Sequence, residues 1–201
     1  MDDSINQHKP EILSSIESRA REINFSMASD RYVGALLRTL VSSKPRSRFL
    51  ELGTGASLSL CWMVDGMDPH SRLITVDHNP KLSEMARAYF GQDKRVEIIC
   101  TNGREWIESY SGEKFDLIFA DTWPGKYSHI EEILKLVEQG GFYVVDDMTC
   151  QPDWPGGHQQ KAEELIAYLE NRDDFHMTKL DWSTGLILMT KKSIPIHKNR
   201  Q

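Results

Sequence analysis

Residues 51–57 read Glu51-Leu52-Gly53-Thr54-Gly55-Ala56-Ser57, and this stretch decides the fold of the chain. The apolar run at residues 48–52 precedes the glycines and a helical pattern follows them, so the segment predicts a strand that turns into a helix. Glycines let the backbone pass close to a ligand, and free amides at a helix N-terminus receive anionic groups. A Gly-x-Gly turn alone is weak evidence of binding, because turns in any α/β protein use glycine.

Strand-like and helical segments continue to alternate beyond this turn. Further strand-like runs are expected at residues 73–76, 96–99, 115–120 and 142–145, with helices near 57–66, 80–90, 102–110 and 126–138. Strand, helix and strand at this spacing indicate βαβ units and a parallel sheet with covered faces. A helix near 158–171 and two strands at 175–180 and 186–189 predict a closing antiparallel hairpin. The predicted fold is therefore α/β, a Rossmann-like doubly wound, mostly parallel seven-stranded sheet.

We expect a single domain over residues 1–201. Residues 1–45 are predicted to form an N-terminal helical cap, because residues 11–23 and the segment from about Asp30 have amphipathic helical spacing. Residues 46–191 are predicted to form the Rossmann-like core. A chain of 201 residues is long enough to bury a substantial core.

Composition and charge limit the kinds of partner that we expect this chain to bind. No stretch approaches about 18 uninterrupted apolar residues, so no membrane partner is expected. The start of the chain lacks the basic and apolar parts of a signal peptide, and the three cysteines form no CxxC pair, which predicts a cytoplasmic protein with reduced thiols. The net charge of −6 and the lack of a basic stripe weigh against extended nucleic-acid binding.

A carboxylate marks the end of the next predicted strand. Asp77 lies 24 residues after Gly53, where a carboxylate can accept both hydroxyls of a ribose. The alternative is that Asp77 caps the helix that begins near Pro80. An NAD site is disfavoured because residues 53–58 lack the third glycine of GxGxxG. Glu51 can face the ammonium group of a sulfonium-bearing cofactor instead.

Three segments of the chain resemble the motifs of class I S-adenosylmethionine-dependent methyltransferases. They are residues 51–59, 74–80 and 115–148. Within that class, the chain resembles the catechol O-methyltransferase-like family and its bacterial O-methyltransferase relatives over about residues 25–190. The most specific part of the resemblance is residues 119–127 followed by residues 140–147.

The resemblance implies S-adenosyl-L-methionine as the cofactor. It assigns the methionine part to the glycine turn and Ser59, the ribose to Asp77, and the adenine to His78 and the segment that begins at Asn102. Met27 matches a position that covers the cofactor, although a place in the core is an equal alternative. The complete expected set of cofactor-binding residues is Met27, Glu51, Gly53, Gly55, Ser59, Asp77, His78, Asn102, Gly103, Asp121 and Trp123.

The resemblance also implies a divalent cation such as Mg²⁺, held by Asp121, Asp146 and Asp147. These residues end the fourth and fifth predicted strands, beside the switch-point crevice of a doubly wound sheet. In the family, the cation lowers the pKa of the acceptor hydroxyl and orients its oxygen. Asp147 stands where relatives have Asn. Without a metal, repulsion would raise at least one carboxyl pKa and make a general base, and a purely structural role is the remaining alternative.

The catalytic residues depart further from the family pattern. Relatives commonly place a lysine three residues after the first metal-binding Asp, and this chain has Pro124 there. Lys126 can reach the same space, so the candidate catalytic residues are Asp121, Lys126 and Asp146, with an exposed, merely solvated Lys126 as the alternative. Around them, Trp123, Trp154 and His158 are candidates for an aromatic acceptor pocket and a base, against ordinary packing roles.

We therefore expect a cytoplasmic enzyme that methylates a hydroxyl of a small molecule, for example a phenol, with a divalent metal as a candidate assistant. One alternative is methylation of a tRNA nucleobase hydroxyl, which the acidic charge balance makes a weaker hypothesis. The other is a cofactor-binding module with weak catalysis, which Pro124 suggests. A homodimer through the N-terminal helices, as in relatives, is left open.

Overall fold

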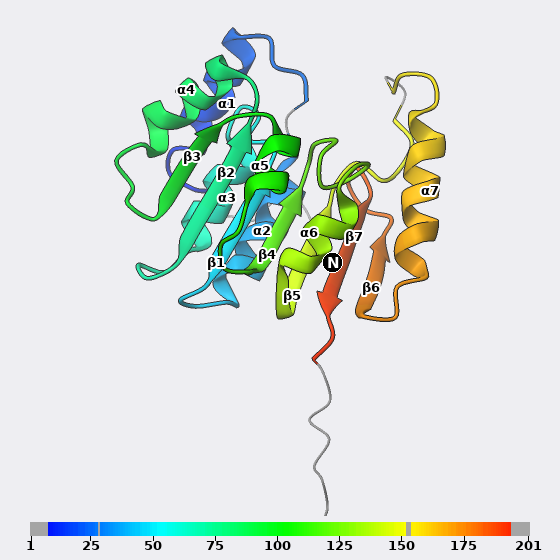
Figure 1. Ribbon diagram of the computed structural model, residues 1–201. Helices are drawn as coiled ribbons and strands as arrows, with labels where there is room; N and C mark the ends of the chain where they lie inside the picture. Colours follow the sequence, from blue (N-terminus) through cyan, green and yellow to red (C-terminus); the bar gives the residue numbers. More distant parts are fainter. Residues whose placement is uncertain (1–7, 28, 152–153, 194–201) are drawn as a thin grey trace, which may run out of the picture.

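The structure, a computed structural model, describes residues 8–27, 29–151 and 154–193 (Figure 1). Its strands form one seven-stranded sheet with the order β3-β2-β1-β4-β5-β7-β6. Strands β1 to β5 pair in parallel, and β7 pairs antiparallel with both β5 and β6. The strands are β1 (Arg48–Leu52), β2 (Arg72–Asp77), β3 (Val96–Cys100), β4 (Phe115–Ala120), β5 (Val137–Val145), β6 (Phe175–Leu180) and β7 (Leu186–Lys191).

Seven helices of the described residues cover the two faces of this sheet. Helices α1 to α4 share one core with the sheet, and α5 to α7 share the other. The helices are α1 (Leu13–Glu22), α2 (Arg31–Ser42), α3 (Leu58–Gly66), α4 (Pro80–Phe90), α5 (Gly103–Ser109), α6 (Ile130–Leu136) and α7 (His158–Glu170). The predicted doubly wound α/β fold is thus confirmed.

Strand alternation explains why both faces are covered. Along β4, Leu117 and Phe119 pack against α1 to α4, whereas Ile118 and Ala120 pack on the opposite face. Because successive strand side chains point to opposite sides, a strand that is apolar throughout must bury both faces. The apolar runs of the sequence are therefore the parallel strands.

The expected helix over residues 126–138 is only partly right. Helix α6 covers Ile130–Leu136, and β5 begins at Val137, earlier than predicted. The additional part of β5 contains Gly140 with a φ of +72°, and its pairing with β4 is irregular between Phe115 and Leu117. The glycine pair at residues 140–141 thus lies within an irregular strand. It interrupts the alternation of residue types along the sequence by which a strand is recognised.

The carboxyl ends of β1 and β4 meet at the switch point of the sheet. β1 pairs with β2 on one side and with β4 on the other, so the chain direction across the sheet reverses between them. Doubly wound sheets open a crevice at this point, just beyond the carboxyl ends of the strands. Within the described residues, no helix is both long and apolar enough to cross a membrane.

We predict that Gly34→Ala destabilises the protein by about 1–3 kcal/mol, because overpacking a rigid contact costs more than helix propensity returns. A Cβ at Gly34 of α2 would lie 2.2 Å from Cδ1 of Trp62, a buried residue of α3. Urea unfolding measures the change. Gly156→Ala is the matched control, since a Cβ there meets nothing within 4 Å. Equal stabilities of the two variants would contradict the prediction.

Candidate active site

The glycine turn after β1 lies against the backbone at the end of β4. Gly53 has a φ of +100°, and a Cβ there would lie 2.7 Å from the carbonyl oxygen of Asp121. The amide of Gly53 donates to Val76 O, and the amide of Asp121 donates to Leu52 O, each at 2.9 Å. Only glycine allows both this φ and this approach. The turn therefore brings three neighbouring strand ends together.

Glu51 lies fully buried beneath this turn. Its carboxylate accepts hydrogen bonds from Ser59 Oγ at 2.6 Å and from Thr75 Oγ1 at 2.5 Å. Burial raises the pKa of Glu51 to about 7, and the two hydroxyl donors oppose that rise. A carboxylate held in this way has no cationic partner among the residues that the structure describes, which suits a site for a positively charged ligand group. Ser59, expected to bind the cofactor, donates to Glu51 in this structure.

Asp77 ties the turn to the end of β2. Its Oδ2 accepts from the amide of Gly55 at 2.9 Å, and its Oδ1 accepts from the amide of Asn79 at 2.8 Å. The N-cap of α4 is Asn79 rather than Asp77. Each carboxylate oxygen has a second lone pair, so the side chain can still accept from a ligand hydroxyl. His78, the next residue, is largely exposed.

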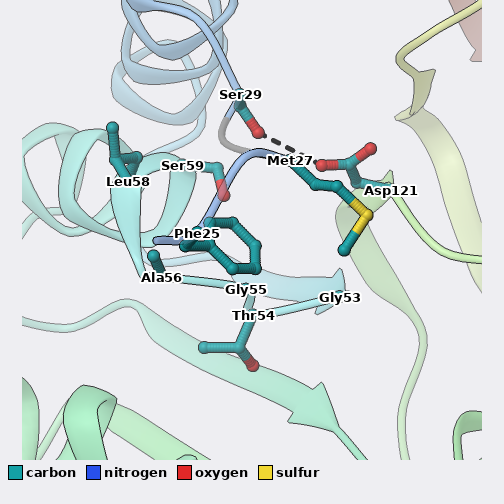
Figure 2. Close-up of a pocket in the computed structure, with 10 residues that line it drawn as sticks. All are labelled: Phe25, Met27, Ser29, Gly53, Thr54, Gly55, Ala56, Leu58, Ser59 and Asp121. Carbon is teal, nitrogen blue, oxygen red and sulfur yellow. Dashed lines mark hydrogen bonds between the residues drawn. The ribbon is translucent and has the colours of Figure 1, made fainter. Parts of the chain in front are cut away.

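A narrow pocket lies over the turn (Figure 2). Its lining joins the turn to β4 and to the residues before α2, which we call the entry segment (residues 25–27 and 29). It consists of Phe25, Met27, Ser29, Gly53, Thr54, Gly55, Ala56, Leu58, Ser59 and Asp121. Its volume is only about 10 Å³, the space of one water, and Phe25 lies close over Gly55. Met27 is 78% exposed, so its interpretation as a core residue was wrong. A larger ligand requires this entry segment to shift.

A second cavity, of about 440 Å³, lies beside the start of α5. Asn102 is the N-cap of α5, with its Oδ1 accepting from the amide of Arg104 at 2.9 Å. A Cβ at Gly103 would lie 3.1 Å from Pro124, so α5 begins close to the loop after β4. The cavity is lined by Asn102, Arg104, Glu105, Trp123, Pro124 and Ser128. Of the residues expected around the adenine, Asn102 lines this cavity, and His78 and Gly103 are not part of its lining.

The three aspartates lie near one another at the ends of β4 and β5. Burial, then the charges of Asp146 and Asp147, raise the pKa of Asp121 well above its ordinary value. Burial raises the pKa of Asp146 to about 6. Asp147 is half-buried and has a φ of +54°, which takes the chain out of β5.

Lys126 is buried within the same group. It is 4% exposed, and its Nζ donates to Asp146 O at 2.6 Å and to Asp147 O at 3.4 Å. Burial lowers the pKa of Lys126, while Asp121, Asp147 and Asp146 act in the opposite direction. The alternative of a solvated lysine was wrong, because the loop after Trp123 turns this side chain inward.

The carboxylates are not arranged as a cation site. Among the described residues, no three side chains of Asp, Glu, His or Cys form a group that could hold a metal ion. Asp146 Oδ1 already accepts from the amide of Asp147 at 2.7 Å and from Thr184 Oγ1, and Asp121 Oδ2 accepts from Ser29 Oγ at 3.1 Å. Two of the carboxylate oxygens thus already accept hydrogen bonds from the protein. The expected metal ligand set stays a prediction.

An aromatic cluster stands beside the aspartates. Trp154 stacks on His158 with ring centroids 4.3 Å apart, and Tyr127 Oη lies 3.1 Å from His158 Nε2. Trp123 meets both Tyr127 and His158 edge-on and is 48% exposed. Burial lowers the pKa of His158 and raises that of Tyr127 to about 12. The cluster offers flat apolar surface next to polar groups, which suits an aromatic ligand.

Sequence reasoning missed several residues of this site. Ser29, Thr184 and Phe25 come from the entry segment and from the β6–β7 turn, which are distant in sequence from the motifs. No local signal marks them. Tyr127 stands next to Lys126 in the most specific motif, so its position in that motif was an available signal.

Comparisons with known proteins point to one family. The family profile described as O-methyltransferase matches residues 3–174. Catechol O-methyltransferase B of Danio rerio is 28% identical over 155 residues, which are 71% of this chain and 59% of that protein. Catechol O-methyltransferase of Mycobacterium tuberculosis is 29% identical over 119 residues, which are 57% of this chain and 54% of that protein. The chain thus matches less than two thirds of the length of these curated relatives.

A solved structure shares the fold. The O-methyltransferase TomG from Streptomyces achromogenes, in complex with SAM, has a TM-score of 0.79 against this chain. The two are 24% identical, and the match covers 92% of each chain. This likeness agrees with the strand order and the switch point described above.

We predict that Glu51→Gln flattens the pH dependence of stability between about pH 4.5 and 7. In this window the unfolded Glu51 ionises while the folded one stays protonated, because its folded pKa is raised from 4.5 to about 7. The contribution of Glu51 to stability is therefore greatest below pH 4.5 and falls by about 3 kcal/mol as the pH rises to 7. Glu51→Gln should not show this decrease in stability between pH 4.5 and 7.

Urea unfolding at several pH values makes this measurement. Glu97→Gln, on exposed β3 surface, is the control and should keep the wild-type profile. Parallel profiles for Glu51→Gln and the wild type would refute the assigned cause.

Proposed function

This chain belongs to the O-methyltransferase family, and on that premise we propose that it transfers a methyl group from S-adenosyl-L-methionine to a hydroxyl oxygen of a small molecule. One observation carries the proposal: the glycine turn lies at the switch point between the buried carboxylate of Glu51 and the carboxylate of Asp77. A cationic amino acid portion suits Glu51, and a ribose suits Asp77. Relatives named as catechol O-methyltransferases support the choice of acceptor.

The proposed cofactor site fits the residues present. Gly53 and Gly55 give the close backbone approach, and Ser59 and Glu51 lie beneath the methionine part. The adenine end is assigned to His78 and to the 440 Å³ cavity beside Asn102, Gly103 and Trp123. Met27, exposed above the turn, covers the cofactor once the entry segment has moved. When bound, the cofactor supplies an electrophilic methyl carbon on a sulfonium sulfur.

The proposed acceptor site adjoins Asp121, at the shared border of the narrow pocket and the aspartates. Asp121, Lys126 and Asp146 are the proposed catalytic residues, since their charged groups lie near one another beside the end of β4, and Asp121 lines the narrow pocket. Trp123 and the stacked Trp154–His158 pair provide walls for a flat acceptor. The divalent cation expected from the sequence stays a prediction, since among the described residues no three side chains of Asp, Glu, His or Cys form a group that could hold one.

Location and assembly stay predictions. A cytoplasmic protein is expected from the sequence, and the described residues contain no helix suited to a membrane. A homodimer through the N-terminal helices is supported by the partly exposed apolar side chains of Ile12 and Ile23 at the two ends of α1.

Calorimetry with S-adenosylhomocysteine, followed by a labelled methyl-transfer assay over phenols, catechols and alcohols, tests the function. We expect saturable binding and transfer to at least one phenolic acceptor. Binding without turnover over the panel would favour a cofactor-binding module, and transfer to tRNA alone would favour the RNA hypothesis. If the chain binds neither S-adenosylhomocysteine nor S-adenosyl-L-methionine, the proposal is wrong.

We predict that Asp77→Asn weakens the binding of S-adenosylhomocysteine by about 10–100-fold, the usual loss for a hydrogen bond to a charged group. Calorimetry measures the dissociation constant. Asp93→Asn is the matched control, because Asp93 Oδ1 also accepts from a backbone amide, that of Arg95 at 2.9 Å, but precedes β3 at the opposite end of the sheet. An unchanged affinity in Asp77→Asn would remove the ribose role.

A further inference from the structure

The ammonium group of Lys126 is held rigidly where β4 and β5 end. The loop backbone folds back on itself, with the amides of Lys126, Tyr127 and Ser128 all donating to Trp123 O. Tyr143 Oη of β5 donates to Gly125 O at 2.5 Å, which fixes the preceding residue. The 4% exposure of Lys126 leaves little room for other rotamers. Its position is therefore set by the fold.

The ammonium group of Lys126 has more N–H donors than it has hydrogen bonds. An ammonium carries three N–H donors. Lys126 donates to two neutral carbonyls, Asp146 O and Asp147 O, and its Nζ lies 5.0 Å from the centre of the Tyr127 ring. No direct ion pair joins it to a carboxylate of the described residues. One donor and the positive charge thus remain available to an oxygen that enters the site.

The charge of Lys126 acts on the carboxyl groups around it. The charge of Lys126 favours ionisation of both Asp121 and Asp146. Meanwhile Asp146 Oδ1 is taken by two protein donors, and Asp121 Oδ2 by Ser29. A divalent ion entering here would meet a buried cation, and two of the carboxylate oxygens already accept hydrogen bonds from the protein.

We propose that Lys126, and not a divalent metal ion, stabilises the acceptor oxyanion during methyl transfer, so that the reaction is metal-independent. This inference rests on the proposed function. The acceptor hydroxyl gives its proton to solvent, and the resulting oxyanion accepts the third N–H of Lys126. The oxygen lone pair then forms the O–CH₃ bond while the C–S bond breaks, and sulfur leaves as a neutral thioether. Lys126 stays protonated throughout.

The proposal specifies the acceptor class. A metal ion binds two neighbouring oxygens and strongly lowers the pKa of a hydroxyl, whereas one ammonium group offers one donor to one oxygen. The chain should therefore methylate phenols with a single acidic hydroxyl as readily as catechols. Aliphatic alcohols, whose hydroxyls ionise far less readily, should be poor acceptors.

The test uses the full chain in three measurements. Transfer to matched monophenols and catechols is compared after exhaustive chelation and after addition of Mg²⁺, and Mn²⁺ binding is followed by electron paramagnetic resonance. We expect equal rates with chelator and with Mg²⁺, no preference for catechols, and no bound Mn²⁺. A rate that chelation abolishes and Mg²⁺ restores, or stoichiometric Mn²⁺ binding to the wild type, overturns the proposal.

Variants supply the third measurement. Lys126→Met should lower kcat by about 100-fold or more, the cost of removing an oxyanion donor, while S-adenosylhomocysteine binding is kept. Lys44→Met is the matched control: Lys44 Nζ also donates to a backbone carbonyl at 2.6 Å, that of Gly140, at the other end of β5. A wild-type kcat in Lys126→Met contradicts the role.

Two failures can be told apart. Absence of S-adenosylhomocysteine binding by the wild type would defeat the proposed function itself. Cofactor binding together with metal-dependent transfer would defeat only the inference about Lys126. The chelation and Mn²⁺ measurements need no variant, so they decide the question even where Lys126→Met does not fold.

Discussion

The close contact between the Gly53 turn and the backbone of Asp121 is the constraint on which the site depends. It holds the ends of β1 and β4 together where the sheet reverses direction. Any side chain at Gly53 would push the two strand ends apart. Because Asp77 ties the same turn to β2, the positions of the proposed ribose, methionine and acceptor sites all follow from one backbone approach.

Several carboxyl groups of the site lie in an environment that disfavours their charge. Glu51 is buried with two hydroxyl donors and no cation among the described residues, and the half-buried Asp121 lies close to the buried Asp146. Such groups lower the stability of the protein, and they persist because the surrounding strands are apolar on both faces. A cationic ligand group beside Glu51 would relieve that cost, so binding energy and stability are linked at this residue.

The sequence predicted the fold well because strand order follows from short apolar runs and one glycine turn. It predicted for the same reason that the candidate residues at the strand ends lie near one another, since parallel strands end at one edge of the sheet. It could not decide whether Lys126 is buried, because that depends on how the loop after Trp123 folds back against Asp146. Thr184 contacts Asp146 through a hairpin turn 38 residues away, a contact without any local pattern.

The left-handed backbone at Asp147 limits how this pocket can change during evolution. With a φ of +54°, the position accepts few residue types apart from glycine, asparagine and aspartate. Asparagine and aspartate have nearly the same shape, so mutation can exchange a neutral amide for a charged carboxylate without rebuilding the end of β5. Descendants of one ancestor can thus differ in the charge of the pocket, and hence in the cation it requires, while the backbone around it stays the same.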